Sequence, residues 1–179
     1  YGLIISRKRI SNIMKDLNLQ VKMKRRYKNT TDSNHNLPIA ANILNRDFYA
    51  ANANEKYVGD ITYIPTGEGW LYLATVIDLY SRKVVGWSMD DSMRVNLVND
   101  ALNMAIVHRK PASGLLWHTD RGSQYASYSH KDLLEKYNII QSMSRKGNCW
   151  DNSVAESFFK SLKQELVYNT YFYTKKQAK

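Results

Sequence analysis

The stretch Tyr57-Val-Gly-Asp60-Ile-Thr-Tyr-Ile-Pro-Thr66 is rich in β-branched and aromatic residues and predicts a strand that ends near Pro65. A long apolar run follows over residues 69–80, and a third over residues 83–89. Turn signals separate the three runs at residues 66–69 and 80–82. Three strands joined by such short turns predict an antiparallel meander.

The chain after the meander alternates between helical and strand patterns. Val98, Ala101, Leu102 and Ala105 mark an amphipathic helix that ends near Arg109. The later elements are expected as a strand over 115–119, a helix over 131–137, a strand over 139–143 and a helix over 153–168. The order βββαβαβα predicts an α/β fold in which two parallel strands extend the meander into a mixed sheet flanked by helices.

The residues before the meander predict two further helices. Ser6 can cap a helix over residues 7–18, and Pro38 can start another through Ile39, Ile43 and Leu44. We therefore divide the chain into three parts: a basic helical segment with a linker (1–36), a connecting helix and loop (37–56), and a catalytic core (57–179).

Composition excludes several classes of protein. The 179 residues are 44% apolar and include 21 aromatic side chains, which excludes a disordered or low-complexity chain. Cys149 is the one cysteine, so an internal disulfide is impossible and a reducing compartment such as the cytoplasm is favoured. No apolar run approaches the roughly 20 residues of a membrane helix. Because the chain begins at Tyr1 rather than at Met, we expect it to be a fragment.

Most of the net charge of +10 lies in the first fifth of the chain, where residues 1–36 hold nine Lys and Arg against two acids. So dense a basic segment favours a polyanion such as DNA as partner. A solvated basic face is the alternative reading. The candidate contacts in this segment are Arg7, Lys8, Arg9, Lys24, Arg25 and Arg26.

Three carboxylates from three separate elements stand out. Asp60 lies inside the first strand, Asp120 ends the fourth, and Glu156 lies in the first turn of the last helix. A charged residue is disfavoured in a strand, and ligands of open α/β sheets bind where strands end. If the three converge, they form an oxygen-ligand site for divalent metal, the kind that supports phosphoryl transfer.

Each acid also has a purely structural reading. Asp60 can be a satisfied acid at a bulge, and Asp120 can belong to the turn Asp120-Arg-Gly122. Ser153-Val-Ala-Glu156 matches a capping box, in which the glutamate bonds back to the cap residue. Spacing alone leaves these alternatives open.

The last helix places Glu156, Lys160 and Lys163 on one face, away from its apolar side. This face is either a solvated Glu–Lys pair or a carboxylate on metal with two lysines beside it on the DNA backbone.

Five motifs resemble the bacterial insertion-sequence transposases whose second reading frame encodes a retroviral-integrase-like catalytic core. They are Tyr57-Val-Gly-Asp60-Ile-Thr-Tyr-Ile, the stretch from Tyr72 through Asp78 and Arg82 to Trp87, His118-Thr-Asp120-Arg-Gly-Ser-Gln-Tyr125, Ser142-Met-Ser-Arg-Lys-Gly-Asn-Cys-Trp-Asp-Asn152 and Glu156-Ser-Phe-Phe-Lys-Ser-Leu-Lys163. The resemblance covers about residues 45–168 and implies an RNase H-like fold with Asp60, Asp120 and Glu156 as the DDE catalytic triad. Lys163 fills the family's basic position seven residues after the glutamate.

The resemblance also implies the chemistry. Two Mg²⁺ ions, replaceable by Mn²⁺, would be held by the triad for strand cleavage at transposon ends and strand transfer into target DNA. Arg145 and Lys146 would form a basic loop near the DNA, and residues 1–36 would be part of a helix-turn-helix-like module. Transposases of this type act in the bacterial cytoplasm, associated with the nucleoid, and as multimers on DNA. Two alternatives remain: a nuclease of the same fold that only hydrolyses, and a non-catalytic DNA-binding fragment or inhibitor.

Three residues within these motifs carry expectations of their own. Trp150 is expected to be half-buried rather than stacked on a base, His118 to be a satisfied strand histidine rather than a tuning residue, and Cys149 to pack rather than react.

Overall fold

A computed structural model describes residues 5–19 and 35–179. Its centre is a five-stranded sheet in the order β3-β2-β1-β4-β5. The strands β1 (Lys56–Thr66), β2 (Gly69–Asp78) and β3 (Val84–Asp90) form the expected antiparallel meander. The short strands β4 (Leu116–Thr119) and β5 (Ile140–Met143) add to it in parallel. The predicted mixed α/β sheet is therefore confirmed.

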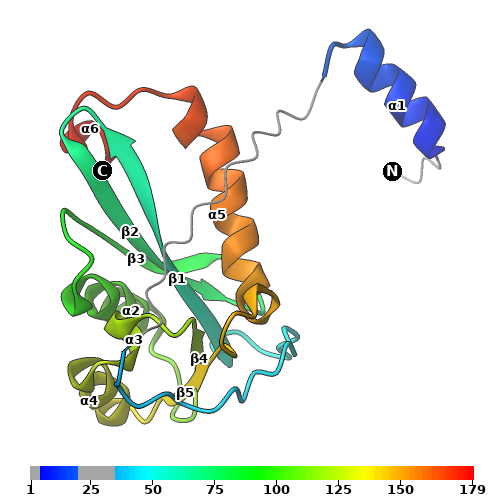
Figure 1. Ribbon diagram of the computed structural model, residues 1–179. Coiled ribbons are helices and arrows are strands. Elements are labelled where there is room, and N and C mark those ends of the chain that lie inside the picture. The colour runs from blue at the N-terminus through cyan, green and yellow to red at the C-terminus, as the bar shows by residue number, and fades with distance from the viewer. Residues whose placement is uncertain (1–4, 20–34) are drawn as a thin grey trace.

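Helices cover both faces of the sheet (Figure 1). On one face lie α2 (Val95–Arg109), the short α3 (Ser123–Ala126) and α4 (Tyr128–Lys136), over a core that contains Tyr57 and Trp117. On the other lies α5 (Ser153–Glu165), which buries Ala155 and Phe159 against apolar side chains of β1 and β2. Alternation along β1 sends odd-numbered residues to the first core and even-numbered residues to the second.

Two glycines allow these layers to approach closely. A Cβ on Gly86 of β3 would collide with the backbone carbonyl of Ala101 in α2, and one on Gly59 of β1 would collide with the ring of Trp117. The lack of a side chain at Gly59 therefore lets Trp117, the largest buried side chain of β4, pack against β1 at the residue that precedes Asp60.

The helix expected after Pro38 is wrong, because residues 37–50 contain no helix. Asn45 and Arg46 have positive φ of 43° and 66°, which a right-handed helix does not accommodate. The backbone N–H groups of Ile43 and Leu44 instead donate to the Ser142 hydroxyl at 2.9 and 3.0 Å. The segment thus runs along the end of the edge strand β5.

The ends of the core also differ from expectation. The last long helix stops at Glu165 rather than near residue 168, and a 3₁₀ turn, Val167–Asn169, follows it. Phe172 then bridges to Thr66, and a short helix α6 (Lys175–Ala178) closes on the tip of the β1–β2 hairpin (Figure 1).

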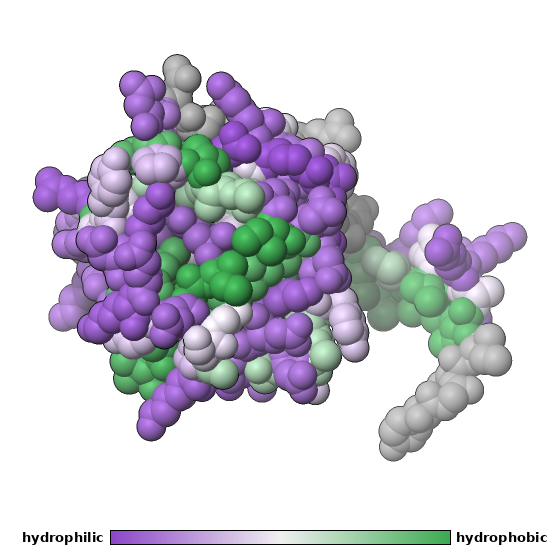
Figure 2. All heavy atoms as spheres, turned by 90° about the horizontal axis from the view of Figure 1, so that it is seen from below, coloured by the Kyte–Doolittle hydropathy of each residue, from purple (hydrophilic) through white to green (hydrophobic). Residues whose placement is uncertain are grey.

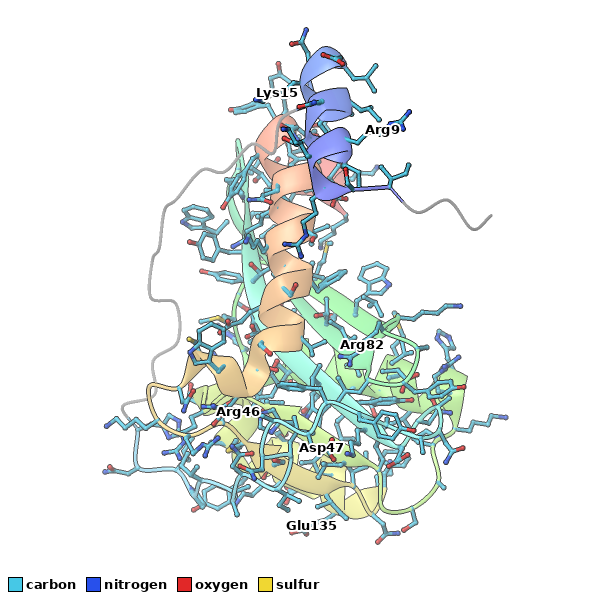
Figure 3. All side chains as sticks on the ribbon, turned by 90° about the vertical axis from the view of Figure 1, so that its right-hand side faces the viewer. Arg9, Lys15, Arg46, Asp47, Arg82 and Glu135 are labelled. Atoms are coloured by element: carbon cyan, nitrogen blue, oxygen red, sulfur yellow. The ribbon has the colours of Figure 1, made fainter. Side chains whose placement is uncertain are left out.

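The basic N-terminal helix α1 spans Arg7–Asp16, with Ser6 as its N-cap as predicted; the Ser6 hydroxyl accepts from the backbone of Arg9. It buries none of its residues, and Arg9 and Lys15 project away from it (Figure 3). Lys24, Arg25 and Arg26 lie outside the described residues.

The face seen in Figure 2 is mostly hydrophilic and carries a hydrophobic band between hydrophilic residues. Within residues 5–19 and 35–179, none of the helices has the length and apolar character needed to cross a membrane.

His130 lies in α4 and is fully buried in the core beneath that helix. The indole of Trp117 donates to its Nε2 at 3.0 Å, so Nδ1 carries the proton and donates to the Asn99 carbonyl oxygen at 2.6 Å. Burial lowers the pKa of His130 to about 4. The neutral ring fits this site, and the charged ring does not.

We predict a pH-dependent stability from this histidine. Because its pKa is lower in the folded chain than the usual 6.5, its contribution is complete above pH 6.5 and is lost as the pH falls towards 4. The difference amounts to up to about 3 kcal/mol. His130→Gln should flatten the dependence of unfolding free energy on pH between 4 and 6.5, measured by urea denaturation. The curve of unfolding free energy against pH should be parallel for Ser129→Ala and the wild type. A His130→Gln curve that is also parallel to the wild type would contradict the prediction.

Candidate active site

Asp60 lies at the point where β1 loses its neighbour β4. The pairing of the two strands ends at Val58 and His118, and β1 continues with one edge free of β4. The carboxylate is half-buried and accepts the backbone N–H of Ile61 at 2.8 Å. Because side chains alternate along a strand, the side chain of Asp60 lies on the same face of β1 as those of Val58 and Thr62, the face that α5 covers.

Asp120 follows β4 directly, at the carboxyl end of a parallel strand. Its side chain accepts the backbone N–H of Gly122 at 2.9 Å, so the turn chemistry expected as an alternative does occur. The same aspartate lines a small cleft together with Asp60, Thr62 and Gln124, with a volume of about 40 Å³. That space holds a few water-sized groups.

Glu156 is the exposed acid of the three, in the first turn of α5. The capping-box alternative is wrong, because the helix is capped at Asn152 and Ser153 is already its first residue. The glutamate side chain is therefore not engaged with the cap.

The three acids influence one another electrostatically. Burial raises the pKa of the Asp60 carboxyl well above its usual range, and the charges of Asp120 and Glu156 raise it further. Burial and Asp120 also raise the pKa of Glu156. The structure thus brings these carboxyl groups, from β1, β4 and α5, into one region where their negative charges oppose each other.

A divalent cation suits this region by its chemistry. All three side chains offer carboxylate oxygens, the ligands that Mg²⁺ and Mn²⁺ prefer, and a cation would offset the repulsion that raises the pKa of Asp60. In the described part of the chain, however, no three acidic, His or Cys side chains already stand close enough to share one ion. By the chemistry of their donor atoms, the three carboxylates therefore fit a divalent cation.

The two lysines of α5 differ in their surroundings. Lys160 is exposed, whereas the ammonium of Lys163 lies 4.3 Å from the ring centroid of Tyr63. Burial lowers the pKa of Lys163, and the charge of Asp60 counteracts this. Lys163 therefore stands close enough to Asp60 to offset part of its negative charge.

The basic loop holds a paired arginine and an exposed lysine. Arg145 forms an ion pair with the buried carboxylate of Asp151 at 2.8 Å, whereas Lys146 is exposed. The expectations for two neighbours are wrong: Trp150 is 69% exposed rather than half-buried, and Cys149 is exposed rather than packed.

His118 is the satisfied histidine that was expected. It is fully buried between the hydroxyls of Ser142 and Ser144, at 2.8 and 3.2 Å. Burial lowers its pKa to about 4, so the ring is neutral near pH 7.

Three residues near the acids escaped the sequence reasoning. Burial raises the pKa of Tyr125 well above its usual value, and the charges of Asp60 and Asp120 raise it further. Asp151 and Asn152 are both buried at the start of α5. All three stand inside the quoted motifs, but a lone Tyr, Asp or Asn in a loop pattern gives no sign of its burial.

A five-stranded mixed sheet of this order, with helices on both faces, defines the RNase H-like fold class that includes retroviral integrase catalytic cores. The chain belongs to the integrase core domain family, whose model matches residues 50–149.

The curated relatives come from insertion elements. The chain is 43% identical over 177 residues to the insertion element IS600 uncharacterized 31 kDa protein of Shigella sonnei, covering 99% of this chain and 65% of that protein. It is 48% identical over 154 residues to transposase InsF for insertion sequence IS3A of Escherichia coli, covering 86% of this chain and 54% of that protein. The chain thus spans less than two thirds of the length of these relatives.

Solved structures agree on the fold. The simian T-cell lymphotropic virus intasome in complex with PP2A regulatory subunit B56 gamma contains a chain that matches with a TM-score of 0.62 at 21% identity, over 78% of this chain and 47% of that one. The HTLV-2 integrase catalytic core domain in complex with magnesium matches with a TM-score of 0.54 at 19% identity, over 64% of this chain and 70% of that one.

The repulsion among the acids predicts an effect on stability. Asp60→Asn removes one charge and keeps an acceptor for the Ile61 N–H, so it should raise the melting temperature of the metal-free chain by about 2–4 °C, the shift that ~1 kcal/mol gives at this size. Mn²⁺ should raise the melting temperature of the wild type and have little effect on the variant. A variant that melts lower without metal, or gains as much from Mn²⁺, would contradict this reading.

Proposed function

We propose that this chain carries the catalytic core of a DNA transposase, in which Asp60, Asp120 and Glu156 hold two Mg²⁺ ions. The observation that carries the proposal is that Asp60 and Asp120 line one cleft of an integrase-type fold, with Glu156 close enough for its charge to act on Asp60. The similarity to a transposase supports DNA as the substrate. Bound magnesium supplies activation of the attacking hydroxyl and stabilisation of the charge that develops on the phosphate.

The residues of the chain would act by holding and orienting. Asp60 and Asp120 line one cleft, so a phosphodiester placed there meets both acids, while Glu156 approaches from α5. In the first reaction, water attacks the phosphodiester at the element end and breaks its P–O3′ bond, which leaves a 3′-hydroxyl on the element and a 5′-phosphate on the flanking strand. In the second, that 3′-hydroxyl attacks a target phosphodiester, forms a new P–O bond that joins the strands, and releases the 3′-hydroxyl of the cut target strand.

The positive groups near the acids have separate roles in this proposal. Lys160 and Lys146 are exposed and free to meet backbone phosphates, and Lys163 neutralises charge beside Asp60. Arg145 keeps its ion pair with Asp151 and presents the rest of its half-exposed guanidinium to the strand. Arg7, Lys8 and Arg9 on α1 would bind DNA away from the acids, and Lys24, Arg25 and Arg26 would add further contacts to DNA.

Asp120→Asn should abolish strand cleavage. The assay is a gel of labelled duplexes that carry the ends of the insertion element flanking the gene, with Mg²⁺ or Mn²⁺. We expect a loss of more than about 100-fold, because an amide binds a divalent cation far more weakly than a carboxylate does. DNA affinity should stay within about twofold.

The products of the same gel distinguish the remaining functions. Joined strands support a transposase, whereas cut strands without joining indicate a nuclease of the same fold. Salt-sensitive DNA binding with no metal-dependent cleavage indicates a non-catalytic DNA-binding chain. Cleavage by Asp120→Asn, or in EDTA, would contradict the assignment of the acids.

Replacing Arg7, Lys8 and Arg9 together by Ala should reduce the salt dependence of duplex binding. If each contacts one phosphate, the slope of log K against log salt falls by about 2.7, that is about 0.9 per contact. Fluorescence anisotropy over a salt series measures this slope. Arg7→Lys with Arg9→Lys keeps the charge and should keep the slope. An unchanged slope in the alanine variant would exclude α1 from the interface.

A further inference from the structure

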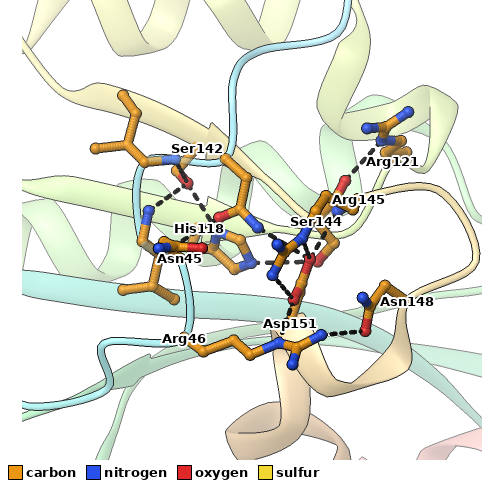
Figure 4. A network of polar contacts seen from close by, with 12 residues as sticks. Asn45, Arg46, His118, Arg121, Ser142, Ser144, Arg145, Asn148 and Asp151 are labelled. Carbon is orange, nitrogen blue, oxygen red and sulfur yellow. Dashed lines mark hydrogen bonds and ion pairs between the residues drawn. The ribbon is translucent and has the colours of Figure 1, made fainter.

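The side chain of Asp151 is fully buried, and its carboxylate accepts a set of hydrogen bonds (Figure 4). Its Oδ2 accepts the backbone N–H and the Nε–H of Arg145 at 2.9 and 2.8 Å, and the side-chain amide of Asn42 at 2.9 Å. Its Oδ1 accepts Nη2–H of Arg145 at 2.8 Å and Nε–H of Arg46 at 2.7 Å. A buried carboxylate is tolerated only when its oxygens are satisfied in this way.

These contacts close the loop that leads into α5. Arg145 stands six residues before Asp151, so their ion pair fixes both ends of the loop. Arg46 makes a second contact, from Nη2 to the Asn148 carbonyl oxygen at 2.8 Å, and so ties the middle of the loop to the segment before β1. The hydrogen bonds of Arg145 hold the pKa of the Asp151 carboxyl well below its usual range.

The next residue connects this cluster to the strand that carries Asp60. The Asn152 side-chain amide donates to the backbone carbonyl of Gly59 at 3.0 Å. Asn152 is the N-cap residue of α5, yet its side chain makes no capping bond to the helix. Its amide is used instead to fix the start of α5 against β1, one residue before Asp60.

A third connection reaches the strand that carries Asp120. Arg121 donates from Nε to the backbone carbonyl of Ser144 at 2.6 Å, and the Ser144 hydroxyl donates to the carbonyl of Thr119 at 3.2 Å. Ser144 directly precedes Arg145. The contacts therefore run without a break from both neighbours of Asp120, through the loop, to the start of the helix that carries Glu156.

We propose that Asp151 is a positioning residue for the metal site: its carboxylate fixes the start of α5 and thereby holds Glu156 at the right place relative to Asp60 and Asp120. The proposal deepens the proposed function and rests on it. Asp151 is not among the residues that line the cleft of Asp60 and Asp120. It acts through the helix, because Glu156 stands five residues on and moves with the first turn.

The geometry favours positioning over stability as the role of this cluster. A buried ion pair contributes little net stability compared with apolar packing, because its desolvation is costly. Arg46 and Arg145 are also each nearly half exposed, at 44% and 47% of their side-chain surface. The cluster instead fixes orientation, because five hydrogen-bond donors meet the one carboxylate of Asp151 from defined directions.

The test is the affinity of the DNA-free chain for Mn²⁺, measured by electron paramagnetic resonance. In Asp151→Asn an amide NH₂ faces the N–H groups of Arg145 and Asn42, so the start of α5 shifts. We expect Mn²⁺ to bind about tenfold more weakly, the usual effect of losing a supporting residue of a metal site. The control is Asp47→Asn, which removes the ion pair between Asp47 and Lys56 and should bind as the wild type does.

A second readout needs neither metal nor activity. Burial and the charge of Asp120 both raise the pKa of Glu156, so Glu156→Gln should raise the melting temperature of the metal-free wild type by about 2 °C. In the Asp151→Asn background this gain should become clearly smaller, because a shifted α5 changes the position of Glu156 relative to Asp120. If Asp151→Asn does not fold, Arg46→Gln, which removes one donor at a half-exposed site, should reduce Mn²⁺ affinity by about threefold.

The outcomes separate this proposal from the function itself. A folded Asp151→Asn that binds Mn²⁺ as tightly as the wild type, or that retains the Glu156→Gln gain, overturns the positioning role. If the wild-type chain binds Mn²⁺ but cleaves no DNA, the proposed function fails, and the Mn²⁺ and melting measurements still decide the role of Asp151. If the wild type binds no Mn²⁺, the melting measurements alone decide it.

Discussion

Neighbouring carboxylates repel one another, and the surrounding elements of this fold hold three of them, Asp60, Asp120 and Glu156, in one region. Asp60 is the most affected, because burial and two neighbouring acids all disfavour its charge. A group in that position destabilises the chain unless a cation offsets it. Lys163 supplies part of this compensation from α5. A divalent metal would supply the rest, which is the physical reason for placing a metal site at these residues.

The sheet brings the acids together, and the connections keep them there. The parallel pairing of β1 with β4 puts Asp60 beside the carboxyl end where Asp120 emerges. Gly59 makes this possible, because the ring of Trp117 occupies the space of a Cβ. Glu156 arrives on a helix whose start is anchored to β1 through Asn152 and to the segment before β1 through Asp151. The site is thus assembled from three elements far apart in sequence, each fixed by its neighbours.

Sequence patterns predicted the parts of this arrangement that depend on local periodicity. The meander, the parallel strands and the helix with Glu156 follow from alternation and helical spacing, and a charged residue inside the strand pattern identified Asp60. The segment over 37–50 could not be predicted in this way, because its backbone is fixed by Ser142, some 100 residues later. The same holds for Asp151, whose partners Asn42 and Arg46 are equally distant, and for the cap of α5 at Asn152. Polar contacts of long sequence separation leave no periodic pattern.

The most direct test of the account is anomalous diffraction from a crystal of the chain soaked in Mn²⁺. The account predicts a manganese peak within coordination distance of both Asp60 and Asp120, with Glu156 turned towards it, and no such peak in Asp120→Asn. A well-ordered crystal that shows no peak between these two aspartates, or a peak that persists in the variant, would contradict the claim that the three acids form a metal site.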